Sequence, residues 1–283
     1  MIVAQDNTAL AAFRAAHSRG SVFVPTMGAL HEGHAELIRR AAAIARERGL
    51  AAGCSVSIFV NPTQFDDKKD FDRYPQTLDA DLAICKAAGA ACVYAPRVQD
   101  IYPPDAPIPV PALPGVATSP RLEDAFRPGH FAGVCQVVAR LFDLVRPAIA
   151  VFGEKDWQQL QVIRAMCPSN PEIIGVETVR EEDGLAMSSR NRFLSAAERK
   201  LGLRISRALF EGRKGRTIEE GERIMRWTLA RSGISPDYAV IREASSLEPR
   251  ATYVKTETYR ALITARVGSV RLLDNGPWSP LAE

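Results

Sequence analysis

The chain has 283 residues, of which 46% are apolar, 24% charged and 7% aromatic, and its formal net charge at pH 7 is +3. These values exclude a disordered or fibrous chain, and the length suits a main domain with a smaller second one. The 36 basic and 33 acidic residues include no long basic tract, so we expect a small anionic ligand and no nucleic acid.

The cysteines and the apolar runs indicate in which cellular compartment the protein is expected. The five cysteines are odd in number and include no Cys-x-x-Cys pair, so we expect free thiols, most of them buried, and no disulfide framework or zinc site. The first twenty residues have a helical pattern that includes Asp6, Arg14 and Arg19, which is unlike a signal peptide. No run is apolar for the length of a membrane span. We therefore expect a cytoplasmic protein with no membrane segment.

Strand-like and helical segments alternate over the first part of the chain. Strands are predicted at 21–25, 54–60, 91–95, 148–152 and 173–179, and helices at 35–48, 78–88, 134–145 and 157–166. Seven prolines between Ile101 and Pro120 favour an extended surface excursion. Because strands that alternate with helices need crossover connections, the pattern predicts a parallel sheet.

The pattern changes near Ser195. Ser195-Ala196-Ala197-Glu198 is a capping-box sequence that predicts a helix start, and Thr217 begins a second helical pattern. Strands are then predicted at 237–241, 259–267 and 270–273. The predicted fold class is α/β, with a Rossmann-like parallel-sheet domain over residues 1–178 and a smaller C-terminal α+β domain over residues 179–283.

Three loops follow predicted strands of the parallel sheet. They are Pro25–His34, Asn61–Phe65 and Gly153–Asp156. Open parallel sheets bind ligands beyond the carboxyl ends of their strands, so we expect the three loops to converge on one site. The G-x-G-x-x-G fingerprint and the P-loop sequence are both absent, and phosphate would have to be held in another way.

His31 and His34 are two of only four histidines in the chain. An isolated H-x-x-H pair usually caps or decorates a helix. Here a strand precedes the pair, and Gly28 and Gly33 would permit close approach of the backbone to a ligand. The start of the helix offers unpaired N–H groups, to which two imidazoles would add donors. The sequence therefore favours a phosphate site at this helix start.

Other polar residues are informative only as a set. Lys155 and the stretch Met187–Asn191 are each typical of solvated turns when taken alone. Together, Lys155, Arg190 and the neighbouring serines would form a cationic clamp for charge that builds on a leaving pyrophosphate. Gln64 and Gln159 could bind hydroxyl groups and a carboxylate, although a lone glutamine is more often a surface side chain.

The ordered set of these motifs resembles the pantoate–β-alanine ligase, or pantothenate synthetase, family of the H-x-G-H nucleotidyltransferase superfamily. The resemblance runs through residues 25–34, 57–65, 73–82, 127–142, 152–164 and 178–198, and more loosely 260–275. It implies ATP-dependent condensation of (R)-pantoate with β-alanine, which gives pantothenate, AMP and diphosphate through a pantoyl-adenylate. It also implies Mg²⁺ with the ATP, a homodimer and a place in the coenzyme A pathway.

The resemblance assigns roles to individual residues. Catalytic roles fall on His34, the proton donor, and on His31, Lys155, Ser188, Ser189 and Arg190. The implied ATP-binding residues are Pro25, Met27, Gly28, Ala29, Leu30, His31, Glu32, Gly33, His34, Gly153, Glu154, Lys155, Asp156, Val179, Met187, Ser188, Ser189 and Arg190. The implied pantoate and β-alanine contacts are Gln64, Gln159, Asn61 and Tyr74, with Arg127 and His130 as weaker candidates. The smaller domain is expected to act as a lid.

Three stretches leave questions open. Asp79 and Asp81 could attract magnesium, but carboxylates early in a helix more often interact with its dipole. Cys167–Pro171 is shorter and richer in proline than in relatives, which puts the end of the preceding helix in doubt. Asp66–Lys68 replaces a stretch that usually starts with glycine, so the loop after Gln64 could differ in conformation.

Two other functions are kept as alternatives. Another adenylyltransferase of the superfamily would need extra cations for a second phosphate group. A catalytically inactive nucleotide-binding module is the other, against which the intact histidine pair and Lys155 argue. A tRNA-charging enzyme is disfavoured because no basic appended domain is visible.

Overall fold

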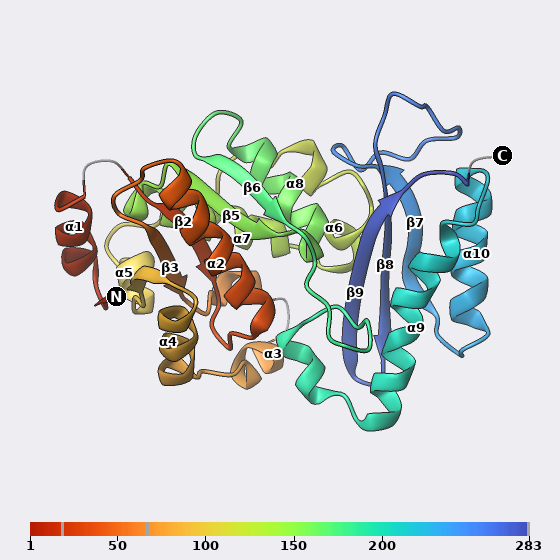
Figure 1. Cartoon of the computed structure of the whole chain (residues 1–283), viewed down its shortest axis with the longest axis horizontal. Coiled ribbons are helices and arrows are strands. Elements are labelled where there is room, and N and C mark those ends of the chain that lie inside the picture. The colour runs from red at the N-terminus through yellow and green to blue at the C-terminus, as the bar shows by residue number, and fades with distance from the viewer. Residues whose placement is uncertain (18–19, 66–67, 282–283) are drawn as a thin grey trace.

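A computed structural model describes residues 1–17, 20–65 and 68–281 and, for residues 68–70, the backbone alone. Six strands form a parallel sheet in the order β1-β4-β3-β2-β5-β6, and three form an antiparallel sheet in the order β7-β8-β9. The two sheets lie at opposite ends of the long axis of the molecule, with the N-terminus beside the first and the C-terminus beside the second (Figure 1).

The parallel sheet consists of β1 (Ile2–Ala4), β2 (Val22–Thr26), β3 (Cys54–Ile58), β4 (Ala90–Tyr94), β5 (Ile149–Gly153) and β6 (Glu172–Val176). Its α-helices are α1 (Asn7–Ala15), α2 (Glu32–Glu47), α3 (Lys68–Arg73), α4 (Leu78–Ala87), α5 (Val98–Ile101), α6 (Glu123–Phe126), α7 (His130–Val145) and α8 (Trp157–Met166). The short 3-10 helices are η1 (Pro62–Gln64), η2 (Gly115–Ala117), η3 (Glu154–Asp156) and η4 (Ser189–Phe193).

The parallel sheet separates two apolar cores. Val22 and Val24 of β2 pack with α2 and α4 on one face, while Phe23 packs with α1, α7 and α8 on the other. This alternation follows from the two-residue period of a strand. Burial on both faces explains why the inner strands are almost continuously apolar. The predicted Rossmann-like architecture is confirmed.

Most predicted elements of this part are present within a few residues. The strand β1 was not predicted, because three residues show no period, although it pairs in parallel with β4. Helix α2 begins at Glu32, three residues before the predicted start, since His31 is its N-cap. Helix α8 has the predicted bounds, and Cys167 is its C-cap, which settles the doubt about its end. The proline-rich segment contains no strand and only η2.

The C-terminal part consists of an antiparallel sheet with two helices against it. Its elements are α9 (Ala196–Gly212), α10 (Ile218–Ala230), β7 (Pro236–Glu243), β8 (Tyr259–Val267) and β9 (Val270–Trp278). The predicted capping box is confirmed, because the Ser195 hydroxyl accepts from the Glu198 N–H and the Glu198 carboxylate accepts from the Ser195 N–H. At the start of α10 the Thr217 hydroxyl accepts from the Glu220 N–H, without the reciprocal bond. The domain boundary at residue 178 stays a prediction.

A buried polar cluster joins the two sheets. The Glu123 carboxylate, on the short helix α6, accepts hydrogen bonds from the Arg271 guanidinium at 2.6 and 2.9 Å and from the Tyr238 hydroxyl at 2.7 Å. Burial alone would raise the pKa of Glu123, but the hydrogen bonds and charge of Arg271 hold it below its usual value. An ionised pair this deep is costly to separate. The antiparallel sheet is thus anchored to the parallel-sheet part.

The thiols match the expectation from the sequence. Cys54, Cys85, Cys92 and Cys135 are buried and Cys167 is partly buried, and all five are free. Within the described ranges, none of the helices has both the length and the apolar character that a membrane crossing requires.

Candidate active site

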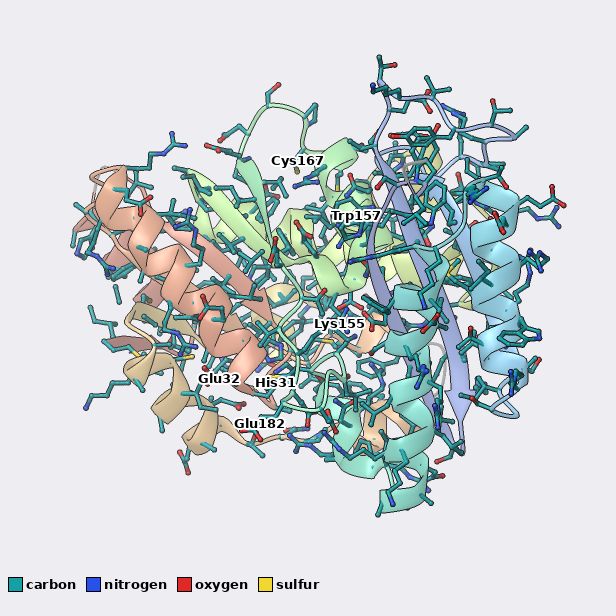
Figure 2. The ribbon with its side chains drawn as sticks, turned by 45° about the vertical axis from the view of Figure 1, so that its right-hand side comes forward. His31, Glu32, Lys155, Trp157, Cys167 and Glu182 are labelled. Atoms are coloured by element: carbon teal, nitrogen blue, oxygen red, sulfur yellow. The ribbon has the colours of Figure 1, made fainter. Side chains whose placement is uncertain are left out.

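A cavity of about 270 Å³ lies at the carboxyl ends of β2, β3 and β5 and extends to the C-terminal part. Residues from the start of α2, η1, α7 and η3 line one side. Residues 177–179 and 185–191, with α9 and β9, line the other. In Figure 2, His31 lies at the N-terminal end of α2, and Lys155 lies between it and the C-terminal part. The three loops predicted from the sequence to converge are all present here.

Hydrogen bonds to the backbone fix both histidine rings. The His31 Nδ1 atom accepts from the Gly33 N–H at 3.1 Å, and the His34 Nδ1 atom accepts from the His31 N–H at 3.3 Å. An imidazole nitrogen that accepts carries no proton, so in the neutral rings the proton is on Nε2. The ring centroids are 4.1 Å apart. The pair therefore caps α2 and keeps two Nε2–H donors for a ligand.

The two glycines of this loop have different purposes. A Cβ on Gly33 would lie 2.9 Å from the His31 Cε1 atom, so only glycine allows His31 to fold over the helix start. Gly28 has a φ of +79°, in the left-handed region that favours glycine. The next residue, Ala29, also has a positive φ of 50°. The loop thus depends on glycine for ring packing and for a backbone turn.

Both rings of the pair are neutral at physiological pH. Burial, followed by the charges of Lys155 and Arg192, lowers the pKa of His31 to about 4. Burial, followed by His31 and Lys155, lowers the pKa of His34 to about 3. A neutral imidazole with a low pKa donates a hydrogen bond without giving up a proton. The pair is suited to binding an anion and poorly suited to acting as an acid or base at pH 7.

Lys155 supplies the cation that faces the histidines. It lies in η3 directly after β5, and its Nζ atom is 3.8 Å from an Asp156 carboxylate oxygen. The Asn275 side-chain amide donates to the backbone carbonyls of Glu154 at 3.0 Å and Lys155 at 2.7 Å. The C-terminal sheet therefore fixes the turn that carries the lysine.

The η1 side of the cavity is built around Asn61. This buried side chain donates to the Gln64 Oε1 atom at 3.1 Å and to the Gly133 carbonyl at 3.2 Å, and it accepts from the Tyr102 hydroxyl at 2.8 Å. The Gln64 Nε2 atom lies 2.7 Å from the Met27 sulfur. The predicted contact residues Asn61 and Gln64 both line the cavity. Asn61 is buried whereas Gln64 is partly exposed, so Gln64 is the more available of the two.

His130 supports Gln64 through the backbone. The His130 Nδ1 atom donates to the Gln64 carbonyl at 3.0 Å, which leaves its Nε2 atom to accept from Arg127 at 3.1 Å. Burial, followed by the charge of Arg127, lowers the pKa of His130 to about 4. A Cβ on Gly133 would lie 2.3 Å from the Thr63 carbonyl oxygen, so glycine allows α7 to approach η1.

The opposite wall comes from the segment between the two sheets. The Ser188 hydroxyl accepts from the Arg190 N–H at 3.3 Å, and the Asn191 amide donates to Glu181 at 2.7 Å and to the Ala186 carbonyl at 3.0 Å. Arg180 makes a two-pronged ion pair with Asp274 of β9 at 2.7 and 2.9 Å. Ser188, Ser189 and Arg190 are half-buried and line the cavity.

Most sequence-predicted site residues are brought together. Those that line the cavity are Pro25, Met27, His31, Gly33, His34, Asn61, Gln64, Tyr74, Arg127, His130, Gly153, Lys155, Asp156, Gln159, Val179, Met187, Ser188, Ser189 and Arg190. The residues that lie outside its lining are Gly28, Ala29, Leu30, Glu32 and Glu154.

The residues outside the lining have other partners. The N–H groups of Ala29 and Leu30 donate to Asp81 and so are not directed at a ligand. Glu32 is exposed and pairs with Arg39. The Glu154 carboxylate accepts from Arg260 at 3.0 Å, which belongs to the contact between the two sheets.

The prediction for the acidic pair near the start of α4 needs a correction. Asp79 is exposed, but Asp81 is buried and its carboxylate accepts two backbone N–H groups of the histidine loop. The helix-dipole interpretation is therefore incomplete for Asp81. Among the described residues no group of three or more His, Cys, Asp or Glu side chains could hold a metal ion. Asp66 and Asp67, also singled out in the sequence, lie outside the described residues.

The Rossmann-like sheet and the H-x-G-H loop at its carboxyl edge are typical of the H-x-G-H nucleotidyltransferases. The model of the Pantoate-beta-alanine ligase family matches residues 2–277. The chain belongs to this family.

Curated relatives and solved structures support the same assignment. A pantothenate synthetase of Nocardioides sp. is 45% identical over 274 residues, which cover 93% of this chain and 80% of the relative. The crystal structure of pantothenate synthetase from Thermus thermophilus is similar with a TM-score of 0.85 and 41% identity, covering 97% of this chain and 98% of that one. A pantoate-beta-alanine ligase from Francisella tularensis, complexed with beta-gamma ATP and beta-alanine, has a TM-score of 0.76 and 30% identity, with 98% and 97% covered.

Proposed function

We propose that this chain condenses (R)-pantoate with β-alanine at the expense of ATP, giving pantothenate, AMP and diphosphate through a pantoyl-adenylate. One observation carries the proposal. Two Nε2–H donors at the start of α2, the Lys155 ammonium and the segment Ser188–Arg190 surround one cavity, which the amide side chains of Gln64 and Gln159 also line. The ATP complex of the related Francisella enzyme supports a nucleotide as the occupant.

The first step needs alignment and charge neutralisation. The pantoate carboxylate, with a reference pKa near 4, is ionised at pH 7 and can attack the α-phosphorus without a general base. The bond between the α- and β-phosphates breaks, and diphosphate leaves with the negative charge. Donors already in place stabilise that charge without reorganisation. We assign this to Lys155 and the Nε2–H groups of His31 and His34, and to Arg190 once its segment has closed over the nucleotide.

This assignment changes the role expected for His34. Its Nδ1 atom accepts from the His31 N–H, and its pKa is about 3, so the ring is neutral at pH 7. We therefore propose hydrogen-bond donation to phosphate in place of proton donation. A triphosphate beside the ring would raise the pKa, but the donor would still be Nε2–H.

Gln64 and Gln159 are proposed to hold pantoate. Neutral amides can bind its hydroxyl groups and carboxylate without pairing the carboxylate with a cation. A carboxylate held in this way keeps more of its nucleophilic character than one in an ion pair with arginine. The Gln64 Oε1 atom accepts from Asn61, which fixes the orientation of the amide. Tyr74, which also lines the cavity, is proposed to contact pantoate or β-alanine.

The second step transfers the pantoyl group to the β-alanine amine. An alkyl ammonium, with a pKa near 10, must lose a proton before its nitrogen can attack the acyl carbon. The low pKa values of His31 and His34 make both rings weak bases. We therefore assign solvent as the proton acceptor. AMP leaves as the C–N bond forms.

Magnesium is proposed to bind with the nucleotide. The described residues offer no cluster of three acidic or histidine ligands. The carboxylates in the cavity lining are those of Asp156, Glu177 and Asp274, and Asp274 is already paired with Arg180. Mg²⁺ usually keeps several waters and binds through substrate phosphates with one or two carboxylates, which this donor set fits. Bound there, it would neutralise phosphate charge.

Three further proposals concern the whole protein. The segment with Ser188–Arg190 would close over the nucleotide, since an acyl-adenylate exposed to water hydrolyses. Because the Glu123–Arg271 pair anchors the antiparallel sheet, we propose that the segment moves and the sheet stays in place. We also propose a homodimer in the cytoplasm, on the strength of the family resemblance.

Pyrophosphate exchange into ATP with single substrates left out tests the function. We expect exchange that depends on pantoate and not on β-alanine, and pantothenate only when all three substrates are present. Exchange that depends on a phosphorylated nucleotide or carrier would indicate another adenylyltransferase. ATP binding without exchange would indicate an inactive nucleotide-binding module.

A further inference from the structure

We propose that Asp81 is a positioning residue for the ligase reaction: it fixes the backbone turn that places His31 and His34 before the triphosphate. The inference rests on the proposed function of the cavity. Asp81 is not among the described residues that line the cavity, so it would act through the loop and not on the substrate.

The contacts of Asp81 are specific to the histidine loop. Its Oδ2 atom accepts from the Ala29 N–H at 3.0 Å, and its Oδ1 atom accepts from the Leu30 N–H at 2.8 Å. The Thr77 hydroxyl donates to Oδ1 at 3.2 Å. Only 1% of Asp81 is exposed. One buried carboxylate therefore binds two consecutive amides of a segment about fifty residues away in the chain.

The backbone of the loop explains why such a clamp is useful. Gly28 and Ala29 both have positive φ values, 79° and 50°. A left-handed conformation is unfavourable for alanine, so a contact outside the loop has to stabilise it. In this conformation the N–H groups of Ala29 and Leu30 are directed at Asp81 and not at the cavity. Leu30 is then followed directly by His31, the N-cap of α2.

A carboxylate is the side chain that suits this task. Each of its two oxygens accepts one amide, whereas asparagine could accept only one and would place an NH₂ group against the other. A Cβ on Gly28 would lie 3.0 Å from the Asp81 Oδ2 atom, so the loop and the carboxylate are in close contact. Because only 1% of Asp81 is exposed, a role as a magnesium ligand would require the loop over it to move.

The test compares Asp81→Asn with two controls on the same stretch. Asp79→Asn makes the same charge change at an exposed site, and Thr77→Val removes the hydroxyl contact but keeps both amide bonds. Pantoate-dependent pyrophosphate exchange, corrected for the folded fraction, gives kcat and the pantoate KM. Nitrogen-15 NMR of the imidazoles gives the titration of His31 and His34. The NMR readout does not depend on the reaction, so an inactive wild-type chain would contradict the proposed function alone.

For Asp81→Asn we expect kcat to fall at least about tenfold with the pantoate KM within about threefold, because misplaced donors lose transition-state contact. The histidine titrations should move up toward the ordinary value, as the rings become more solvated. Both controls should stay within about twofold of wild type in kcat. Wild-type kcat and unchanged titrations in the folded Asp81→Asn protein would overturn the proposal.

If Asp81→Asn does not fold, Gly28→Ala tests the clamp from the other side. It adds a methyl group at a positive φ, against the Asp81 carboxylate, and leaves the charge in place. The same loss of kcat and the same shift of both titrations are expected. Wild-type values for both in Gly28→Ala would overturn the proposal in that case.

Discussion

The two walls of the cavity are built differently. In the histidine loop Gly28, Ala29 and Leu30 are buried, and the N–H groups of Ala29 and Leu30 donate to Asp81. Backbone N–H groups also hold both imidazole rings through their Nδ1 atoms. Across the cavity, Ser188–Arg190 is only half-buried and is followed by an exposed Arg192. The first wall belongs to the parallel-sheet core, and the second to a segment between the two sheets.

This difference separates the preorganised part of the site from the adaptable part. Donors held by a rigid backbone stabilise transition-state charge without further cost, whereas a half-exposed segment has to lose freedom when it binds. We infer that the histidine loop is ready before ATP arrives and that the Ser188–Arg190 segment completes the site afterwards. Four predictions test this contrast.

The largest effect is expected from His34→Ala. Loss of a preorganised donor to the phosphates should lower kcat for adenylate formation by about 10²–10³-fold. Pantoate-dependent pyrophosphate exchange measures it. The matched control is His17→Ala, because His17 caps the end of α1 with a bond to the Phe13 carbonyl and does not line the cavity. A loss of kcat of less than about threefold in His34→Ala would show that the His34 ring does not take part in adenylate formation.

Arg190→Ala should have a smaller effect. We expect adenylate formation to slow by roughly 10–100-fold with little change in pantoate binding, because a partly solvated cation contributes less than a fixed donor. Rapid-quench measurement of the adenylate separates the step from binding. Arg192→Ala, on the same turn but exposed and outside the lining, is the control. An unchanged first step together with equal losses of ATP and pantoate affinity would refute the clamp.

Gln159→Arg tests the neutral pantoate wall. An ion pair with arginine should tighten pantoate binding but slow adenylate formation by about tenfold, because the carboxylate becomes a weaker nucleophile. Single-turnover rates at saturating pantoate give the comparison. Gln159→Leu, which removes the amide without adding charge, should weaken pantoate binding. Faster adenylate formation in Gln159→Arg would contradict the account.

The smallest effect concerns stability at acid pH. The folded pKa values of His31 and His34 are about 4 and about 3, below the ordinary 6.5, so the unfolded chain binds more protons in that range. Stability should therefore be complete above pH 6.5 and fall as the pH drops toward these values. Because both rings are partly exposed, we expect the protonation of His34 to lower the free energy of unfolding by only on the order of 1–2 kcal/mol between pH 7.5 and pH 5.

Urea unfolding at pH 7.5 and pH 5 measures this loss. His34→Gln is the informative variant, since glutamine does not titrate but its Oε1 atom can still accept the His31 N–H. Its stability should change less with pH than that of the wild type. An equal change in both proteins would show that His34 does not contribute.

The sequence predicts what local patterns determine. The apolar run of β3 and the stripe of α7 follow from periodicity, and the caps at Ser195 and Thr217 follow from side chains within one turn. The convergence of the three loops follows from parallel topology, which places the carboxyl ends of strands at one edge. These features need no knowledge of distant contacts.

The features that were missed all depend on contacts between distant segments. Asp81 has the local signal of a helix-dipole partner, and only the fold brings it to the histidine loop. In the sequence Gly133 is only a residue that disfavours a helix. The structure explains it, because α7 packs against the Thr63 carbonyl, where a Cβ would not fit. Glu123 lies in a four-residue helix, and its partner Arg271 is 148 residues away. A pattern over a short stretch of sequence cannot predict these pairs, because the two members of each pair lie far apart in the chain.

The central claim is that the histidine pair binds phosphate before the rest of the site is complete. A crystal structure of the protein with a non-hydrolysable ATP analogue, but without pantoate, tests it most directly. We expect phosphate oxygens within hydrogen-bond distance of both imidazole Nε2 atoms and of the Lys155 Nζ atom, with the histidine loop unchanged. Adenosine bound elsewhere, or phosphates held only by Ser188–Arg190 with the imidazoles uncontacted, would contradict the claim.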